Sequence, residues 1–226
     1  MEENVIEYDE CYIAFLDLLG FKKRIEKKSC AEILKIYDEM KVPLKQIMHK
    51  GKCLMEEGDV KAKVMSDSIC FYVNTQKPNA LFALVSVCMM FQINLAKREE
   101  PILVRGGIVK GGIYAQNDVM FGSGLTNAYL LEEKSAIYPR IIMLKQVVDE
   151  LLLRVEEYGQ GLIEKMVIAD MDGFYIVNYL YFMKQWGKNE EIERLYNYSE
   201  LILASEYDSS VREKYLYLKN KLNLIK

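Results

Sequence analysis

The stretch "CYIAFLDLLGFKKRI", residues 11–25, carries the feature that decides the fold. Residues 12–17 form a continuous apolar run whose length is typical of a buried strand. The run ends in a carboxylate, Asp17, and Gly20 then breaks the pattern before a basic segment. An aspartate in this position is either a cap for the next element, which is the commoner case, or a ligand held on a rigid strand. The rest of the chain has to decide between the two.

Composition places the chain among globular proteins. It has 226 residues, of which 51% are hydrophobic and 28% charged, and its net charge is −3. This allows one sizeable core and gives no general argument for binding nucleic acid or a membrane. The chain begins with an acidic, polar segment unlike a signal peptide, and no apolar run approaches the roughly 18 residues of a membrane helix. The five cysteines lack CxxC spacing, which favours reduced thiols and a cytoplasmic location.

Hydrophobic periodicity predicts alternating strands and helices along most of the chain. Segment 60–73 is expected to form two strands joined by a turn that contains Asp67. Segment 164–180 is expected to form a hairpin that turns at Asp172 and Gly173. Further strands are predicted at 12–17, 102–115 and 138–144, and helices at 30–48, 78–97, 125–136, 145–159, 190–206 and 208–225. This alternation predicts an α/β or α+β domain with a helical tail.

Two features of the sequence limit the chemistry. His49 is the only histidine, which excludes sites built on several histidines, and it lies in a basic stretch, 45–52, expected to be helical and solvent-facing. Asp170 and Asp172 have a spacing that a metal site can use, but a hairpin turn explains them with fewer assumptions. Any catalysis must therefore depend on other carboxylates, on basic residues and on bound metal.

Two carboxylates stand where predicted strands end or turn. Asp17 and Asp67 are 50 residues apart, so only the fold can bring them together. On adjacent strands they could hold one or two Mg²⁺ ions, which prefer oxygen ligands and keep positions for a phosphate substrate. The segment 18–23 begins a helical region whose free N–H groups suit a phosphate, and Arg105 could add positive charge. Each residue also has an ordinary interpretation: a cap for Asp17, a turn residue for Asp67 and an ion-pair partner for Arg105.

The order of these motifs resembles the class III nucleotidyl cyclases. F-x-D-x-x-G-F occurs at 15–21, K-x-x-S-D-S at 63–68, V-R-G-G-I-x-x-G at 104–111 and N-A-x-x-L-E at 127–132. The variant looks closest to the Pycsar-type bacterial antiviral cyclases, which make cyclic pyrimidine nucleotides. That likeness is carried by "YIAFLDLLGF", "AYLLEEKSAIYPRIIM" and "DMDGFYIVNYL". The resemblance spans about residues 11–180.

The resemblance implies a metal site and a phosphate site. Asp17 and Asp67 match the two metal-binding carboxylates of the family, and the Leu18 carbonyl is a further candidate ligand. Together they would hold two Mg²⁺ or Mn²⁺ ions. The backbone of Leu18, Leu19, Gly20 and Phe21 matches the loop that holds the triphosphate.

Two basic residues also match family positions. Arg105 falls at the family's strand arginine, near the phosphates or the dimer interface. Lys63 falls where purine cyclases place a base-reading residue.

The chain departs from the family on one helix. Purine cyclases usually carry an Asn there and an Arg four residues later, and both stabilise the transition state. Aligning the motif on its final Ala-x-x-Leu-Glu places Thr126 and Leu130 at these positions, with Asn127 one residue off. Arg140, at the start of the next predicted strand, is our candidate for the missing group, and a surface ion pair is the alternative.

The resemblance implies a ferredoxin-like α/β sandwich at 8–182, with a C-terminal helical extension at 183–226. We expect a homodimer with shared active sites that converts UTP or CTP to 3′,5′-cyclic UMP or cyclic CMP and pyrophosphate. Its product would be read by a separate cyclic-nucleotide-binding effector in antiviral defence. Two alternatives remain: an adenylyl or guanylyl cyclase, and a nucleotide-binding dimer on a cyclase scaffold that has lost turnover.

Overall fold

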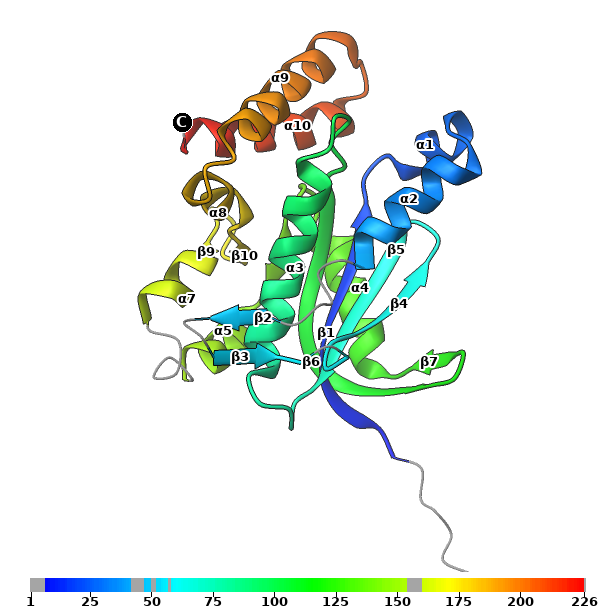
Figure 1. Ribbon diagram of the computed structural model, residues 1–226, viewed down its shortest axis with the longest axis vertical. Coiled ribbons are helices and arrows are strands. Elements are labelled where there is room, and N and C mark those ends of the chain that lie inside the picture. Colours follow the sequence, from blue (N-terminus) through cyan, green and yellow to red (C-terminus); the bar gives the residue numbers. More distant parts are fainter. Residues whose placement is uncertain (1–6, 42–46, 50–51, 57, 154–159, 226) are drawn as a thin grey trace, which may run out of the picture.

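The computed structural model describes residues 7–41, 47–49, 52–56, 58–153 and 160–225 (Figure 1). Its main sheet has the strand order β4-β5-β1-β6-β8-β10-β9, and β7 pairs with β6 outside this path. The strands are β1 (Asp9–Leu18), β4 (Lys61–Met65), β5 (Ser68–Asn74), β6 (Val104–Gln116), β7 (Val119–Phe121), β8 (Ile141–Met143), β9 (Val167–Ala169) and β10 (Tyr175–Val177).

The first half of the sheet has the ferredoxin-like arrangement expected from the sequence. Helices α1 (Phe21–Lys27) and α2 (Cys30–Lys41) connect β1 to β4, and α3 (Ala80–Ala96) connects β5 to β6. Strand β1 is antiparallel to both of its neighbours, β5 and β6. The strands β1 and β4 form one split β-α-β unit, and β5 and β6 form the other. Together they give the order β4-β5-β1-β6. The apolar run that opened the sequence analysis is therefore a central strand.

Alternate side chains of β1 serve two different cores. Ala14 and Leu16 lie in the main cluster with α3, which is buried along almost its whole length. Ile13 and Phe15 belong to a smaller cluster on the opposite face, together with Ala128 of α4 (Ser123–Ser135). Because both faces of the strand are covered, its sequence is continuously apolar rather than alternating.

Glycines of β6 allow α4 to lie in close contact with that strand. A Cβ placed on Gly107 would lie 2.9 Å from Cγ of Leu131, and one on Gly111 would lie 2.8 Å from Cα of Gly124. The glycines of β6 thus mark a close approach of another element, as their pattern indicated. These contacts set the distance between α4 and β6, the strand that carries Arg105.

The second half of the chain extends the sheet. Strand β8 is parallel to β6, and β10 is antiparallel to both β8 and β9. The predicted hairpin at 164–180 is confirmed in its β9–β10 part. The helices of this half are α5 (Lys145–Leu152), α7 (Gln160–Met166), α8 (Tyr179–Gln185), α9 (Asn189–Ser205) and α10 (Ser209–Asn223).

The last two helices share the main core of the molecule. Ile192 and Leu195 of α9, and Leu218 and Leu222 of α10, are buried in the same cluster as the sheet and α3. Figure 1 shows α9 and α10 side by side at one end of the molecule. The separation of 8–182 from 183–226 as two units stays a prediction.

The expectation of a helix around His49 is wrong. Ile47–His49 is strand β2, antiparallel to β3 (Lys52–Met55) in a separate two-stranded sheet. Cross-strand pairing between β2 and β3 supplies the backbone hydrogen bonds that a helix would otherwise supply. The connection between the two strands, and Pro43 within the predicted helix 30–48, lie outside the described residues.

Within the described part of the chain, no helix is both long and apolar enough to span a membrane.

Candidate functional site

The fold brings Asp17 and Asp67 to the same end of two adjacent strands. Asp17 lies near the end of β1 and pairs with Ser68, the first residue of β5. Asp67 immediately precedes Ser68, and its carbonyl accepts a hydrogen bond of 2.9 Å from the Leu18 amide. Two carboxylates 50 residues apart in sequence thus share one corner of the sheet.

The turn that carries Asp67 is held by a tyrosine from α2. Ser66 has a positive φ of 56°, and its carbonyl accepts a 2.6 Å hydrogen bond from the Tyr37 hydroxyl. Burial, and then the nearby Asp67 carboxylate, raise the pKa of the Tyr37 hydroxyl above its ordinary value. The position of Asp67 therefore depends on a contact between two distant segments.

Arg105 lies between two carboxylates. In the register of the sheet it is directly opposite Asp17, and its Nε donates a 3.0 Å hydrogen bond to Asp17 Oδ2. The same Nε lies 2.8 Å from Oε1 of Glu132 on α4. The Glu132 side chain is only 4% exposed. Burial raises its pKa to about 7 despite Arg105, and the charges of Asp17 and Asp67 contribute to the rise.

Two backbone amides of the loop predicted to hold a triphosphate already donate hydrogen bonds within the protein. The amide of Leu18 donates to Asp67, and that of Leu19 donates 2.9 Å to the Leu103 carbonyl. Gly20 adopts a left-handed φ of 73°, which permits the sharp exit from β1 into α1. A phosphate role for this loop would therefore depend on the amides of Gly20 and Phe21.

Lys63 lies on the same face of the sheet as Asp17. It pairs with Cys70 in β5, and the pleat directs both toward the α4 side. Its Nζ donates to the carbonyl of Asn117, at the tip of the β6–β7 hairpin. The predicted base-reading role of Lys63 is compatible with this placement and stays a prediction.

The two α4 positions that the resemblance assigns to transition-state stabilisation hold Thr126 and Leu130. Thr126 is exposed, and its hydroxyl donates 3.2 Å to the Gly122 carbonyl of its own helix. Leu130 is half-buried, and Asn127 is exposed.

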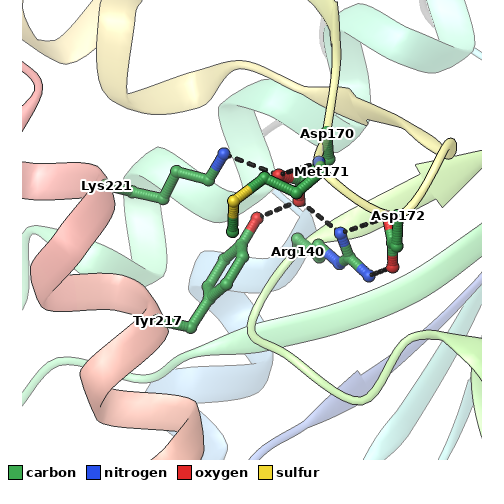
Figure 2. A network of polar contacts seen from close by, with 6 residues as sticks. All are labelled: Arg140, Asp170, Met171, Asp172, Tyr217 and Lys221. Carbon is green, nitrogen blue, oxygen red and sulfur yellow. Dashed lines mark hydrogen bonds and ion pairs between the residues drawn. The ribbon is translucent and has the colours of Figure 1, made fainter.

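Arg140, our candidate replacement, lies in a buried ionic network (Figure 2). Its guanidinium contacts Asp170 and binds both carboxylate oxygens of Asp172, one of them at 3.0 Å. Lys221 Nζ and the Tyr217 hydroxyl, both from α10, also donate to Asp170. The terminal nitrogens of Arg140 are thus engaged by carboxylates, so its catalytic role would require this network to rearrange.

The same network identifies residues that sequence reasoning missed. The turn at Asp170 and Asp172 is confirmed, because the Asp170 amide donates 2.8 Å to the Phe174 carbonyl across it. Sequence alone gave no partner for either carboxylate. Sequence reasoning used Glu132 only as the last residue of the N-A-x-x-L-E motif. A charged residue on the inner face of an amphipathic helix nevertheless indicates a charged partner, because such residues are almost never fully buried unless paired.

The residues present fit a magnesium or manganese site that a substrate completes. Within the described ranges, no group of three or more His, Cys, Asp or Glu side chains is arranged to hold an ion. Asp17 and Asp67 supply two carboxylates, and Mg²⁺ is commonly bound by one or two carboxylates together with substrate phosphates. This end of the sheet is therefore suited to a metal whose remaining ligands are water or substrate phosphates.

Comparison with known proteins finds solved structures that share this fold. No protein-family model matches the chain, and no curated protein matches it. Among solved structures, the monomeric guanylyl cyclase domain of the RhoGC fusion protein from the aquatic fungus Blastocladiella emersonii superposes with a TM-score of 0.53 at 14% identity, covering 76% of this chain and 96% of that one.

A second solved structure gives the same result. The catalytic core of a rhodopsin-guanylyl cyclase with converted specificity, in complex with ATPαS, gives a TM-score of 0.53 at 13% identity, covering 77% of this chain and 98% of that one. The expected fold is confirmed: the chain has the fold of a class III nucleotidyl cyclase catalytic domain.

Proposed function

We propose that this protein is a metal-dependent nucleotidyl cyclase whose preferred substrate is a pyrimidine nucleoside triphosphate, UTP or CTP. The observation that carries the metal-dependent cyclase activity is the pairing of Asp17 with Ser68, which brings Asp17 and Asp67 to the same end of the sheet. The pyrimidine preference is supported by the sequence resemblance alone. The fold and the order of the motifs support the same reaction class.

The reaction is an intramolecular phosphoryl transfer. The ribose 3′-hydroxyl loses its proton to water, its oxygen forms a new bond to the α-phosphorus, and the bond from that phosphorus to the leaving pyrophosphate breaks. Such chemistry depends on positioning and on neutralising charge more than on covalent catalysis. Asp17 and Asp67 would hold Mg²⁺ or Mn²⁺, which supplies positive charge to the reacting phosphates.

The chain's own groups would orient the substrate. The backbone of residues 18–21 would receive the triphosphate at the turn where Gly20, which is exposed, leads from β1 into α1. Arg105 would add positive charge at the phosphate end, and Lys63 would contact the base from β4, which is separated from β1 by β5. With Thr126 and Leu130 in the usual transition-state positions, we expect turnover to be slow relative to a purine cyclase that has both groups, by about 10²–10³-fold for one missing donor.

One assay tests the proposal. Purified protein is incubated separately with ATP, GTP, CTP and UTP and with Mn²⁺, and the products are separated by chromatography. We expect a cyclic monophosphate and pyrophosphate from UTP or CTP. No cyclic product from either pyrimidine would reject the pyrimidine assignment, and a product from ATP or GTP alone would replace it with a purine cyclase.

One observation favours a second candidate, a nucleotide-binding protein without turnover. Leu130 has no hydrogen-bond donor, the Thr126 hydroxyl already donates to the Gly122 carbonyl, and Arg140 is engaged by Asp170 and Asp172. This candidate predicts Mn²⁺-dependent binding of a nucleoside triphosphate, measured by calorimetry, with no release of pyrophosphate.

The wider context is part of the proposal. We infer a cytoplasmic homodimer with active sites shared between subunits, supported by exposed apolar side chains on β4, β7 and α4, including Met65, Phe121 and Tyr129. The cyclic product would be read by a separate cyclic-nucleotide-binding effector in antiviral defence. Light scattering at several protein concentrations tests the dimer.

A further inference from the structure

We propose that Glu132 is a positioning residue: it holds the Arg105 side chain away from Asp17 when Asp17 binds a divalent cation. The inference deepens the proposed function, because it concerns the use of Asp17 as a metal ligand. It assigns to the last residue of the α4 motif a task that neither the fold nor the motif specifies.

The argument begins with one donor placed between two acceptors. Arg105 Nε–H is hydrogen-bonded to Asp17 Oδ2 at 3.0 Å. Glu132 Oε1 lies closer to the same nitrogen, at 2.8 Å, yet it is buried and has no hydrogen-bond partner among the described residues. A single N–H cannot point well at both oxygens, because a hydrogen bond weakens steeply away from linearity.

Leaving a buried oxygen without a hydrogen bond costs free energy. The Arg105 Nε–H therefore gains a favourable partner if it turns from Asp17 to Glu132. If Asp17 turns toward a cation, its Oδ2 no longer needs the Arg105 proton. The Nε–H can then complete its hydrogen bond with Glu132 by a small change of angle. The cost of separating Asp17 from Arg105 is thereby offset by satisfying Glu132.

The surrounding packing makes Glu132 a fixed partner. Leu131, its neighbour in sequence, lies against Gly107, so α4 cannot approach or leave β6 without a clash or a gap. Arg105 is two residues from Gly107 on that same strand. The backbone that carries Glu132 therefore stays close to the strand that carries Arg105, whichever group Asp17 binds.

The charges around Asp17 explain why Arg105 needs a second carboxylate partner. Without Glu132, the only carboxylate that contacts Arg105 among the described residues would be Asp17. An arginine bound to Asp17 competes with a cation for the same oxygens. Glu132 removes that competition and leaves the positive charge of Arg105 near the phosphate end of the site.

The test measures Mn²⁺ binding without nucleotide, by the electron paramagnetic resonance signal of free Mn²⁺, in the full-length protein. Glu132→Gln should weaken Mn²⁺ binding roughly tenfold, the size of a typical coupling between contacting charged groups. Adding Arg105→Gln to it should restore binding to within about twofold of wild type, because the competitor of Asp17 is gone. Glu133→Gln is the matched control, since it removes an exposed charge from the adjacent position and should change little.

Three results would overturn the inference. They are unchanged Mn²⁺ binding in Glu132→Gln, equal weakening in Glu133→Gln, and failure of Arg105→Gln to restore binding in the double variant. A purely structural role for Glu132 would lower the unfolding temperature without this rescue, so thermal unfolding is measured in parallel.

The test remains decisive in two difficult cases. If Glu132→Gln does not fold, Arg105→Gln alone must bind Mn²⁺ at least as tightly as wild type, and weaker binding rejects the inference. A failure of the proposed function is seen separately, because the cyclase assay can give no product while the Mn²⁺ measurements still show the Glu132–Arg105 coupling.

Discussion

Replacing Asp170 by Asn should destabilise the protein strongly, because it removes the central charge of a buried network. The Asp170 side chain is 1% exposed. It accepts hydrogen bonds from Lys221 at 2.7 Å, from the Met171 amide at 2.9 Å, and from Tyr217 and Arg140. Removing one member of a buried ion pair costs about 3–5 kcal/mol, since its partners keep their charge without compensation. We expect Asp170→Asn to fall in that range.

Acid should act on the same group. Burial alone would raise the pKa of Asp170, but hydrogen bonds from Lys221, Tyr217, the Met171 amide and Arg140 together hold it well below the usual value of 3.8. A carboxyl whose pKa is lower in the folded state contributes its full stabilisation above its unfolded pKa and loses it as the pH falls below that value. The Asn variant should therefore lose less stability than wild type as the pH is lowered from about 5 to about 3.

Urea unfolding followed by far-ultraviolet circular dichroism measures both effects. Asp172→Asn is the matched control, because Asp172 contacts the same arginine but its side chain is 42% exposed. Solvent screening limits the loss there to about 1 kcal/mol. A loss below about 1 kcal/mol in Asp170→Asn, or equal losses in both variants, would refute the assignment of Asp170 as the centre of the network.

Three further predictions concern backbone conformation, packing and base preference. Gly20→Ala should lower the free energy of unfolding in urea by about 1–2 kcal/mol, because the φ of Gly20 is +73°, although space for a Cβ is open. The control Gly161→Ala, which also has open space, should be neutral or slightly stabilising. Gly106→Ala should prevent stable folding or lower the unfolding temperature by more than about 10 °C, since its Cβ would lie 2.6 Å from the Phe15 carbonyl oxygen; a well-folded variant would contradict the β1–β6 spacing. Lys63→Ala should change the ratio of products from the four nucleoside triphosphates more than Lys61→Ala, two residues earlier on β4; an unchanged ratio would reject Lys63 as a base-reading residue.

The parts of the fold set by local pattern could be predicted from the sequence. The apolar run at 12–17, the turn at Asp67 and the hairpin at Asp172 and Gly173 each have a short-range signal, and the structure contains all three. The stretch around His49 could not be predicted in this way. Its few residues carry a weak helical pattern, and cross-strand pairing with 52–55 outweighs local preference there.

The predictable part of the candidate site is the part fixed by strand ends. Asp17 and Asp67 stand out because a carboxylate beside a buried strand is unusual unless it is paired or binds a metal. The partners of Arg105 and Arg140 could not be predicted, because Glu132 and Asp170 reach them only through packing between elements that are distant in sequence. Ion-pair geometry of this kind depends on tertiary contacts and leaves no periodic signal.

The most direct test of the central claim is the release of pyrophosphate and cyclic monophosphate from UTP or CTP with Mn²⁺ by wild type, Asp17→Asn, Asp67→Asn and Asp9→Asn. Asp9 lies at the opposite end of the same strand as Asp17 and serves as the matched carboxylate control. We predict product from wild type and Asp9→Asn, and none from Asp17→Asn or Asp67→Asn, with all four proteins folded by circular dichroism. Product formed at the wild-type rate by either of the latter two variants would contradict a metal site at this corner of the sheet.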